Sequence, residues 1–205
     1  MNKLHILIIA ASIVIIVAFS LYTFGSQSPV SKSGTKENPV NSVAQVSNSE
    51  PSASTVSTYV NRENPGNFYS IQFPSKVVVE RGNASGSYTA ILPQGVFLVR
   101  LVDIPDNSDV PLVLLTQIQP ALKSSLQDFN RVGYNQFIVG GHRAWDLAYT
   151  WKNATIRMES IKAIVEGSDN AAAITFSGPR QEFGTQNTNS TVIKPVIESF
   201  HWIGQ

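Results

Sequence analysis

Three carboxylates stand at intervals of three residues in segment 103–109 (DIPDNSD). Asp103, Asp106 and Asp109, with Asn107 between them, could offer oxygen ligands to a hard cation such as calcium. Their spacing matches no standard calcium loop. The alternative is therefore a solvated turn in which Asp109 caps a following helix. We predict no cofactor, with calcium as the alternative.

Catalytic patterns are missing from the sequence. Its three histidines are far apart: His5 lies in an apolar run, His142 in a turn and His201 near the end. The chain has no HExxH, GxSxG, P-loop or GxGxxG pattern. It has no cysteine, which excludes disulfides, thiolate metal sites and cysteine nucleophiles. We predict a protein that is not an enzyme and has no catalytic residues. Arg143 could pair with a carboxylate, which the sequence does not identify.

Three Asn-x-Ser/Thr sequons begin at Asn83, Asn153 and Asn189. Such sequons are acceptors for glycans only outside the cytoplasm. Two of the three fall in predicted turns or at a helix start, where a glycan could be tolerated. The sequence thus predicts a glycoprotein whose C-terminal part lies outside the cytoplasm.

The N-terminal residues 4–24 contain no Asp, Glu, Lys or Arg. About 20 apolar residues span a bilayer, whereas the apolar region of a cleaved signal peptide has about 7–15. We therefore predict an uncleaved signal anchor over residues 1–25, a single transmembrane helix that holds the protein in the cell membrane. Cleavage near Gly25 is the alternative.

Residues 26–58 are rich in Ser and Thr and lack Phe, Trp, Leu, Ile and Met. Such a segment cannot bury enough apolar surface to offset its conformational entropy. We predict a flexible linker with an average reach of roughly 30 Å.

Residues 59–205 are long enough for one domain. They carry 12 Lys and Arg against 12 Asp and Glu, so this part of the chain is close to neutral. A nucleic-acid-binding domain usually shows a basic excess or stripe. No nucleic acid is therefore expected as a partner.

The core of this domain is predicted as an antiparallel meander over residues 135–179. Aromatic and aliphatic residues occupy alternate positions from 145 to 151, which is typical of a strand with one buried face. The aromatic stripe favours core packing, with a stacking platform for a ligand as the alternative. Strand-like runs precede the meander at 68–73, 88–92 and 96–102.

Two helical segments are expected around these strands. The first follows Asp109, with Leu115, Ile118, Leu122 and Leu126 at helical spacing and a kink at Pro120. The second covers residues 192–200, with Ser190 or Thr191 as its cap. Because strands and helices do not alternate, the fold class is α+β, an antiparallel sheet flanked by helices.

Three short motifs resemble those of the PsbP-like domain family. They are residues 66–74 (GNFYSIQFP), similar to G-F-S-I-x-Y-P; residues 141–144 (GHRA) leading into 147–149, similar to G-x-x-A; and residues 192–200, similar to v-x-x-i-x-x-S-F. The resemblance implies an α-β-α sandwich in a membrane-anchored microbial member. The best-known members are extrinsic subunits of photosystem II that help to retain calcium and chloride, and nuclear relatives bind a small GTPase.

The shared theme of that family is docking to something else. We therefore expect a membrane-tethered extracytoplasmic accessory module that binds a membrane protein complex, is not catalytic, and contacts the bilayer through residues 4–24. The alternative is an extracytoplasmic ligand- or calcium-binding protein. Docking predicts an exposed apolar or shaped patch and no buried charged cleft, whereas calcium binding predicts clustered carboxylates.

Overall fold

The computed structural model of the chain describes residues 56–62, 68–75, 77–82, 86–104, 109–168, 170–185 and 188–204. The predicted anchor lies outside these residues, as does the predicted linker except for its last three positions. The first strand begins at Val56, so strand structure starts inside the segment that was predicted as linker. No helix of the described residues is long and apolar enough to cross a membrane.

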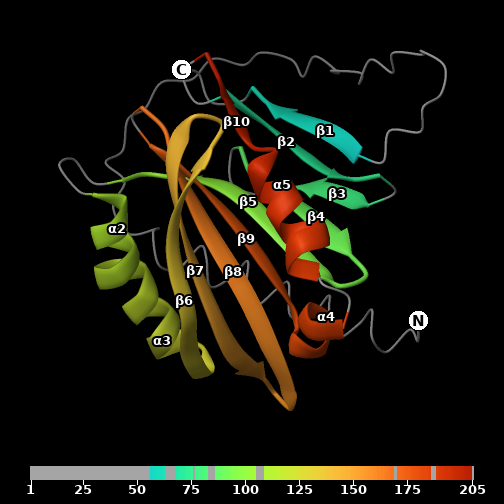
Figure 1. Cartoon of the computed structure of the whole chain (residues 1–205), viewed down its shortest axis with the longest axis vertical. Helices are drawn as coiled ribbons and strands as arrows, with labels where there is room; N and C mark the ends of the chain where they lie inside the picture. The colour runs from blue at the N-terminus through green and yellow to red at the C-terminus, as the bar shows by residue number, and fades with distance from the viewer. Residues whose placement is uncertain are drawn as a thin grey trace, which may run out of the picture. The chain divides into compact units, whose positions relative to one another are not determined.

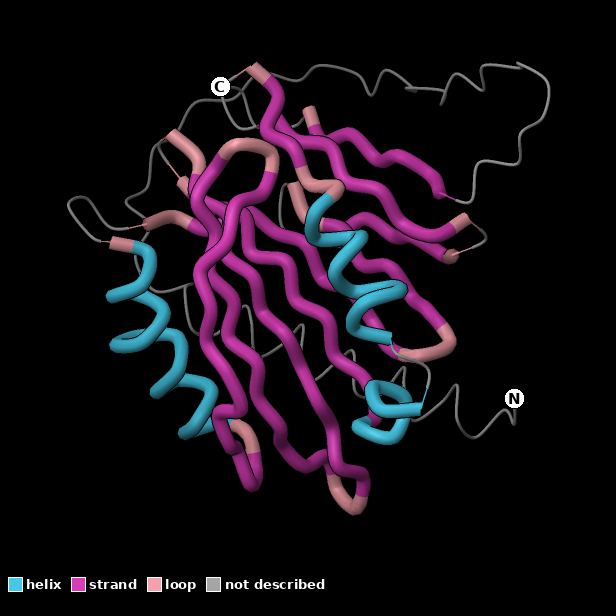
Figure 2. Tube along the Cα trace, in the orientation of Figure 1, coloured by secondary structure: helices cyan, strands magenta, loops and turns pink. Residues whose placement is uncertain are grey.

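Two antiparallel sheets contain most of the described residues (Figure 1, Figure 2). The larger has seven strands in the order β3-β4-β5-β9-β8-β7-β6, and the smaller has three in the order β1-β2-β10. The strands are β1 (Val56–Asn61), β2 (Phe68–Pro74), β3 (Val78–Arg81), β4 (Tyr88–Leu92), β5 (Gly95–Val102), β6 (Gln127–Val139), β7 (His142–Asn153), β8 (Ile156–Glu166), β9 (Ala171–Pro179) and β10 (His201–Ile203).

The predicted meander is confirmed as β6 to β9, which pair antiparallel in sequence order. Gly140 and Gly141 make the turn between β6 and β7 with φ values of 56° and 86°, a region that favours glycine. A Cβ atom on Gly140 would lie 3.0 Å from the carbonyl oxygen of Phe200 and 2.8 Å from Nδ1 of His201. The turn therefore needs glycine both for its backbone and for the close approach of the C-terminal segment.

One face of the large sheet, here called the α5 face, packs against the small sheet and helix α5 (Figure 1). Alternate residues of β5, β9 and β8 form this core, among them Phe97, Phe176 and Ile161. The ring centroids of Phe97 and Phe176 lie 4.8 Å apart. The ring of Phe200 lies 5.2 Å from that of Tyr69 and 5.1 Å from that of Trp202, two paired residues of the small sheet, and all three rings belong to this core.

Helix α5 (Lys194–Glu198) is preceded by a π-helical turn, η2 (Asn189–Ile193). The predicted apolar stripe is confirmed, because Ile193, Val196 and Ile197 are buried. The predicted caps are wrong: the cap position is Thr188, and its side chain makes no capping hydrogen bond. A short helix α4 (Arg180–Thr185), which was not predicted, follows β9 directly.

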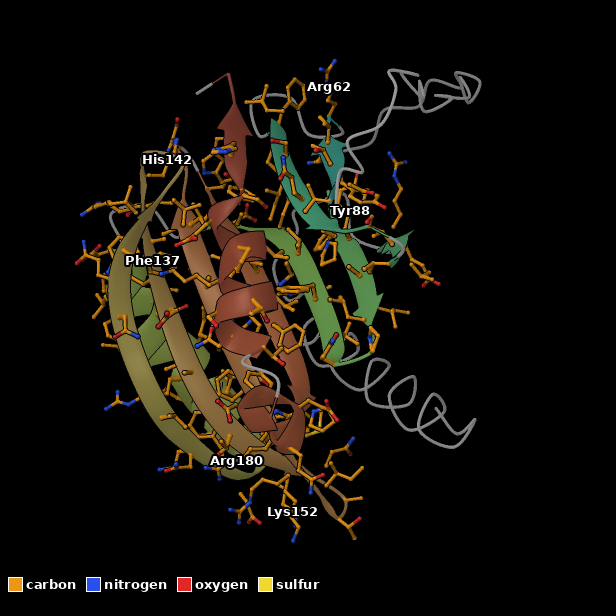
Figure 3. The ribbon with its side chains drawn as sticks, turned by 45° about the vertical axis from the view of Figure 1, so that its right-hand side comes forward. Arg62, Tyr88, Phe137, His142, Lys152 and Arg180 are labelled. Carbon is orange, nitrogen blue, oxygen red and sulfur yellow. The ribbon has the colours of Figure 1, made fainter. Side chains whose placement is uncertain are left out.

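A helical segment lies on the opposite face, here called the α2 face, alongside β6 (Figure 1, Figure 3). This segment consists of α2 (Val110–Val113), a π-helical turn η1 (Leu114–Ile118) and α3 (Gln119–Ser125). The predicted irregularity at Pro120 is thus accommodated by a π turn directly before it. The buried residues are Val110, Val113 and Leu114, whereas Leu115 of the predicted stripe is exposed.

The aromatic stripe of β7 is confirmed as core. Trp145, Leu147, Tyr149 and Trp151 are buried on the α2 face, and small Ala144 and Ala148 lie on the other face. The predicted fold class is confirmed in part, as an antiparallel sheet with helices on both faces. The secondary-structure content differs from the prediction, because strands predominate and the helices are short. The three-stranded sheet was not predicted.

Candidate docking edge and buried basic cluster

The predicted calcium loop is described only at its two ends. Asp103 is exposed just after β5, and Asp109 is exposed at the cap position of α2, where its side chain makes no capping hydrogen bond. Asp106 lies outside the described residues. The described residues contain no group of three or more His, Cys, Asp or Glu placed to hold a metal ion. Calcium binding by Asp103, Asp106 and Asp109 stays a prediction.

The predicted glycan acceptors lie at accessible positions where they are described. Asn153 is half-buried at the hairpin between β7 and β8, and Asn189 is exposed at the first position of η2. Asn83 lies outside the described residues. Glycosylation of the three residues stays a prediction.

The carboxylate that pairs with Arg143 is Glu166. Nε of Arg143 donates to Oε2 of Glu166 at 2.9 Å and Nη2 donates to Oε1 at 3.2 Å, which makes a two-point pair across β7 and β8. The guanidinium also lies 5.3 Å from the ring centroid of Trp145. This pair is exposed, so its contribution to stability is small. The Arg143–Glu166 pair forms part of the surface beside the C-terminal end of β6.

The outer edge of β6 is the first candidate site. β6 is the last strand of the large sheet and pairs with β7, and its other edge pairs with no strand of the described residues. The first half of β6 is irregular, with register shifts between Gln127 and Asn130 and between Arg131 and Gly133. Such bulges protect an edge strand from pairing with another chain.

The second half of β6 lacks that protection. Residues 134–139 pair with β7 in regular register, and no charged residue or proline occurs from position 132 to 141. The hairpin that they form with β7 extends beyond the start of α2, and Phe137 and His142 mark its two arms (Figure 1, Figure 3). Ile138 is 61% exposed. This part of β6 can therefore accept a further strand.

A buried basic cluster on the α2 face is the second candidate site. Lys162 lies in the middle of β8 and is only 7% exposed, and its Nζ donates to Oγ1 of Thr175 on β9 at 2.9 Å. Burial, together with the positive charge of Arg100, lowers the pKa of Lys162 to about 7. Burial also lowers the pKa of Arg100 on β5. A buried charged cluster was not expected for a docking module.

A line of hydroxyl groups continues from this cluster along the same face. Nε1 of Trp151 donates to Oγ of Ser160 at 3.0 Å, and the Ser160 and Ser177 hydroxyls are 2.8 Å apart. Burial raises the pKa of Tyr149 to about 12, and its hydrogen bond with Ser160 opposes this shift. The hydroxyl groups of Ser160 and Ser177 are therefore hydrogen-bonded on a face where an apolar core was expected.

Neither site was found from the sequence. Arg100 and Lys162 interrupt apolar runs (FLVRLV and IKAIV), and a lone charge inside such a run is a signal that could have been followed. The absence of charge and proline between positions 132 and 141 was equally visible. Its meaning depends on the sheet order, which the sequence did not provide.

The family models and the curated proteins compared with the chain show no match. Solved structures do match. The solution structure of cyanobacterial PsbP (CyanoP) from Synechocystis sp. PCC 6803 is similar with a TM-score of 0.55 and 10% identity, over 76% of this chain and 98% of that one. The crystal structure of LpqN, involved in cell envelope biogenesis of Mycobacterium tuberculosis, is similar with a TM-score of 0.53 and 15% identity. This match covers 72% of this chain and 91% of LpqN. At such identities the likeness shows the fold.

Proposed function

Because the chain contains a domain with the PsbP-like fold, we propose that it is a membrane-tethered, extracytoplasmic accessory module that docks on a membrane protein complex and is not catalytic. The observation that carries this proposal is the regular, uncharged outer edge of β6, which pairs with no other strand in the part of the chain that the structure describes. The apolar run 4–24 and the sequons support the tether and the side of the membrane. The fold shared with LpqN, a protein involved in cell envelope biogenesis, agrees with the proposed location outside the cytoplasm.

Docking takes place by strand addition. An extended segment of a subunit of the complex pairs with residues 134–139 through backbone hydrogen bonds, which supply affinity. Ile138 offers an exposed apolar contact on the α2 face beside the Arg143–Glu166 pair. The partner segment is therefore expected to be uncharged and to carry an apolar residue opposite Ile138.

A single lysine on this edge is expected to prevent docking. In Ile138→Lys the added ammonium would project from the α2 face beside the side chains of the incoming strand, and charged side chains on an edge strand oppose pairing. After light crosslinking in native membranes, capture of the full chain should recover a defined complex. Ile138→Lys should recover about tenfold less of it, which corresponds to about 1.4 kcal/mol of binding free energy.

Val78→Lys is the matched control for this capture. Val78 is 59% exposed on β3, the edge strand at the other end of the same sheet, and β3 already carries Glu80 and Arg81. It should recover as much complex as the unchanged chain. Equal losses in both variants, or none in Ile138→Lys, would remove β6 as the docking edge. Recovery of a second copy of this chain alone would show self-association in place of docking to a complex.

A further inference from the structure

Lys162 is the most deeply buried cationic side chain among the described residues. It forms no ion pair with any of them. Its ammonium group has three donors, and within the described residues its one hydrogen bond goes to Oγ1 of Thr175. The charged group that acts on it electrostatically is another cation, Arg100. A buried cation without an anion is unfavourable, so this position favours a negatively charged group.

Strand register places Arg100 on the same face as Lys162. Thr175 pairs with Lys162 on one side and with Leu98 on the other. Arg100 lies two residues beyond Leu98, so its side chain emerges on the α2 face too. Arg100 is half-buried, which puts solvent on the β5 side of the cluster. Because Arg100 has a further interaction of its own, the inference rests on Lys162.

The side chain of Lys162 extends from β8 to Thr175 on the neighbouring strand β9. Next to Thr175 on the same face of β9 lies Ala173, which pairs with Arg100 on one side and with Ile164 on the other. A methyl side chain at this position obstructs a group held between β5 and β8 less than any larger residue. The three strands therefore present two cations and one hydroxyl around a strand of small side chains.

We propose that Lys162, Thr175 and Arg100 bind an oxyanion, a carboxylate or phosphate group, on the α2 face of β5, β9 and β8. The oxyanion accepts hydrogen bonds from the remaining donors of Lys162 and from the guanidinium of Arg100. Charge-assisted bonds of this kind are stronger than neutral ones. The cluster lies on the central strands, away from the β6 edge, so this site is independent of docking.

Binding of the oxyanion requires protonated Lys162. The groups that face Lys162 from the neighbouring strands are Leu147 on β7, Thr175 on β9 and Arg100 on β5, and the nearest phenol, Tyr149, has a pKa raised to about 12. Lys162 is thus the group that changes charge around neutral pH. A carboxylate is expected to bind more tightly at pH 6 than at pH 9.

The test uses the full chain with three probes at constant ionic strength: inorganic phosphate, acetate and decanoate. The readouts are the melting temperature and the ¹⁵N resonance of the Lys162 side chain, followed through a titration. At least one probe should raise the melting temperature and shift this resonance, more strongly at pH 6 than at pH 9 for the carboxylates. A preference for phosphate identifies a phosphoryl group, and a preference for decanoate over acetate identifies a carboxylate on an apolar body.

Lys162→Met should weaken the binding of the effective probe by about tenfold or more, as loss of a charged hydrogen-bonding partner predicts. Lys152→Met is the matched control, because the side chain of Lys152 is 41% exposed at the far end of β7 (Figure 3). This variant should bind the probe as tightly as the unchanged chain does. Methionine at position 162 is compatible with the buried site, so this variant should fold. No response to any probe, or equal binding by Lys162→Met, would overturn the proposal.

Discussion

Lys162→Met is expected to raise the free energy of unfolding at pH 7 by about 1–3 kcal/mol. The folded-state pKa of Lys162 is about 7, against an ordinary value of 10.5, so the folded state disfavours the proton that the unfolded chain keeps. This difference costs about 4 kcal/mol at pH 7. Methionine removes that cost, but it leaves the Thr175 hydroxyl without its donor, which offsets about 1–3 kcal/mol.

The pH dependence of stability separates this explanation from a simple gain in packing. From pH 7 to 9.5 the unfolded chain binds more protons at Lys162 than the folded protein does, by about half a proton at pH 7 and nearly one above about pH 8. Stability of the unchanged chain should therefore rise with pH, by up to about 1.4 kcal/mol per pH unit. The slope is about half of this value at pH 7 and has nearly vanished at pH 6, one unit below the folded-state pKa. The raised pKa of Tyr149 acts in the opposite direction above pH 10, so measurements stop at 9.5.

Urea unfolding at pH 6, 7, 8 and 9 measures both effects without any ligand. The Lys162→Met variant should lack the rise that Lys162 contributes. Lys152→Met, at an exposed position with only a 3.9 Å pair to Asp128, should keep that rise and differ from the unchanged chain by less than about 0.5 kcal/mol. Parallel pH curves for the unchanged chain and Lys162→Met would contradict the assignment of a lowered pKa to Lys162.

Phe200→Ala is expected to lower the free energy of unfolding by about 3–5 kcal/mol, the usual cost of a large cavity in a core. Phe200 is fully buried and lies between Tyr69 and Trp202 at 5.2 and 5.1 Å. It follows α5 and precedes β10, so the truncation removes contacts that join the small sheet to the α5 face. The loss includes ring–ring interactions beyond burial.

Urea unfolding of Phe200→Ala and Phe129→Ala compares two identical truncations. Phe129 is half-buried on β6, and its aromatic neighbour is Tyr149 at 5.4 Å. A smaller loss is expected for Phe129→Ala, with an unchanged dependence on denaturant in both variants. Equal losses would mean that the C-terminal segment contributes no more to the core than the β6 surface does.

The elements that depend on local pattern were predictable from the sequence. The alternation around Trp145 and Trp151 persists because β7 is regular along its whole length, and one buried face follows directly from period 2. The apolar stripe of Ile193, Val196 and Ile197 identified the last helix in the same way. Both predictions rest on contacts between neighbours in sequence and on one buried face.

Features that depend on bulges or distant pairing were not predictable. The first half of β6 has no clear alternation because its register shifts at Gln127 and Arg131 break the period. The small sheet gains its third strand, β10, because Trp202 pairs with Tyr69, more than 100 residues away in sequence. No local pattern encodes that pairing.

The two candidate sites depend on the same distant information. Arg100 and Lys162 share a face only once β5, β9 and β8 are placed side by side in their observed register. The edge at Ile138 exists only because β6 is the last strand of its sheet. The predicted carboxylate site, in contrast, relied on spacing along a loop, and its middle residue Asp106 lies outside the described residues.

Hydrogen–deuterium exchange tests strand addition to β6 most directly. The amides of residues 134–139 are compared in the full chain alone and in the crosslinked membrane complex, with the amides of β3 as the internal control. Strand addition predicts that exchange slows at alternate positions of 134–139, where the outward-facing amides gain hydrogen bonds. Unchanged exchange along β6 in a complex that is demonstrably present would contradict the proposed docking edge.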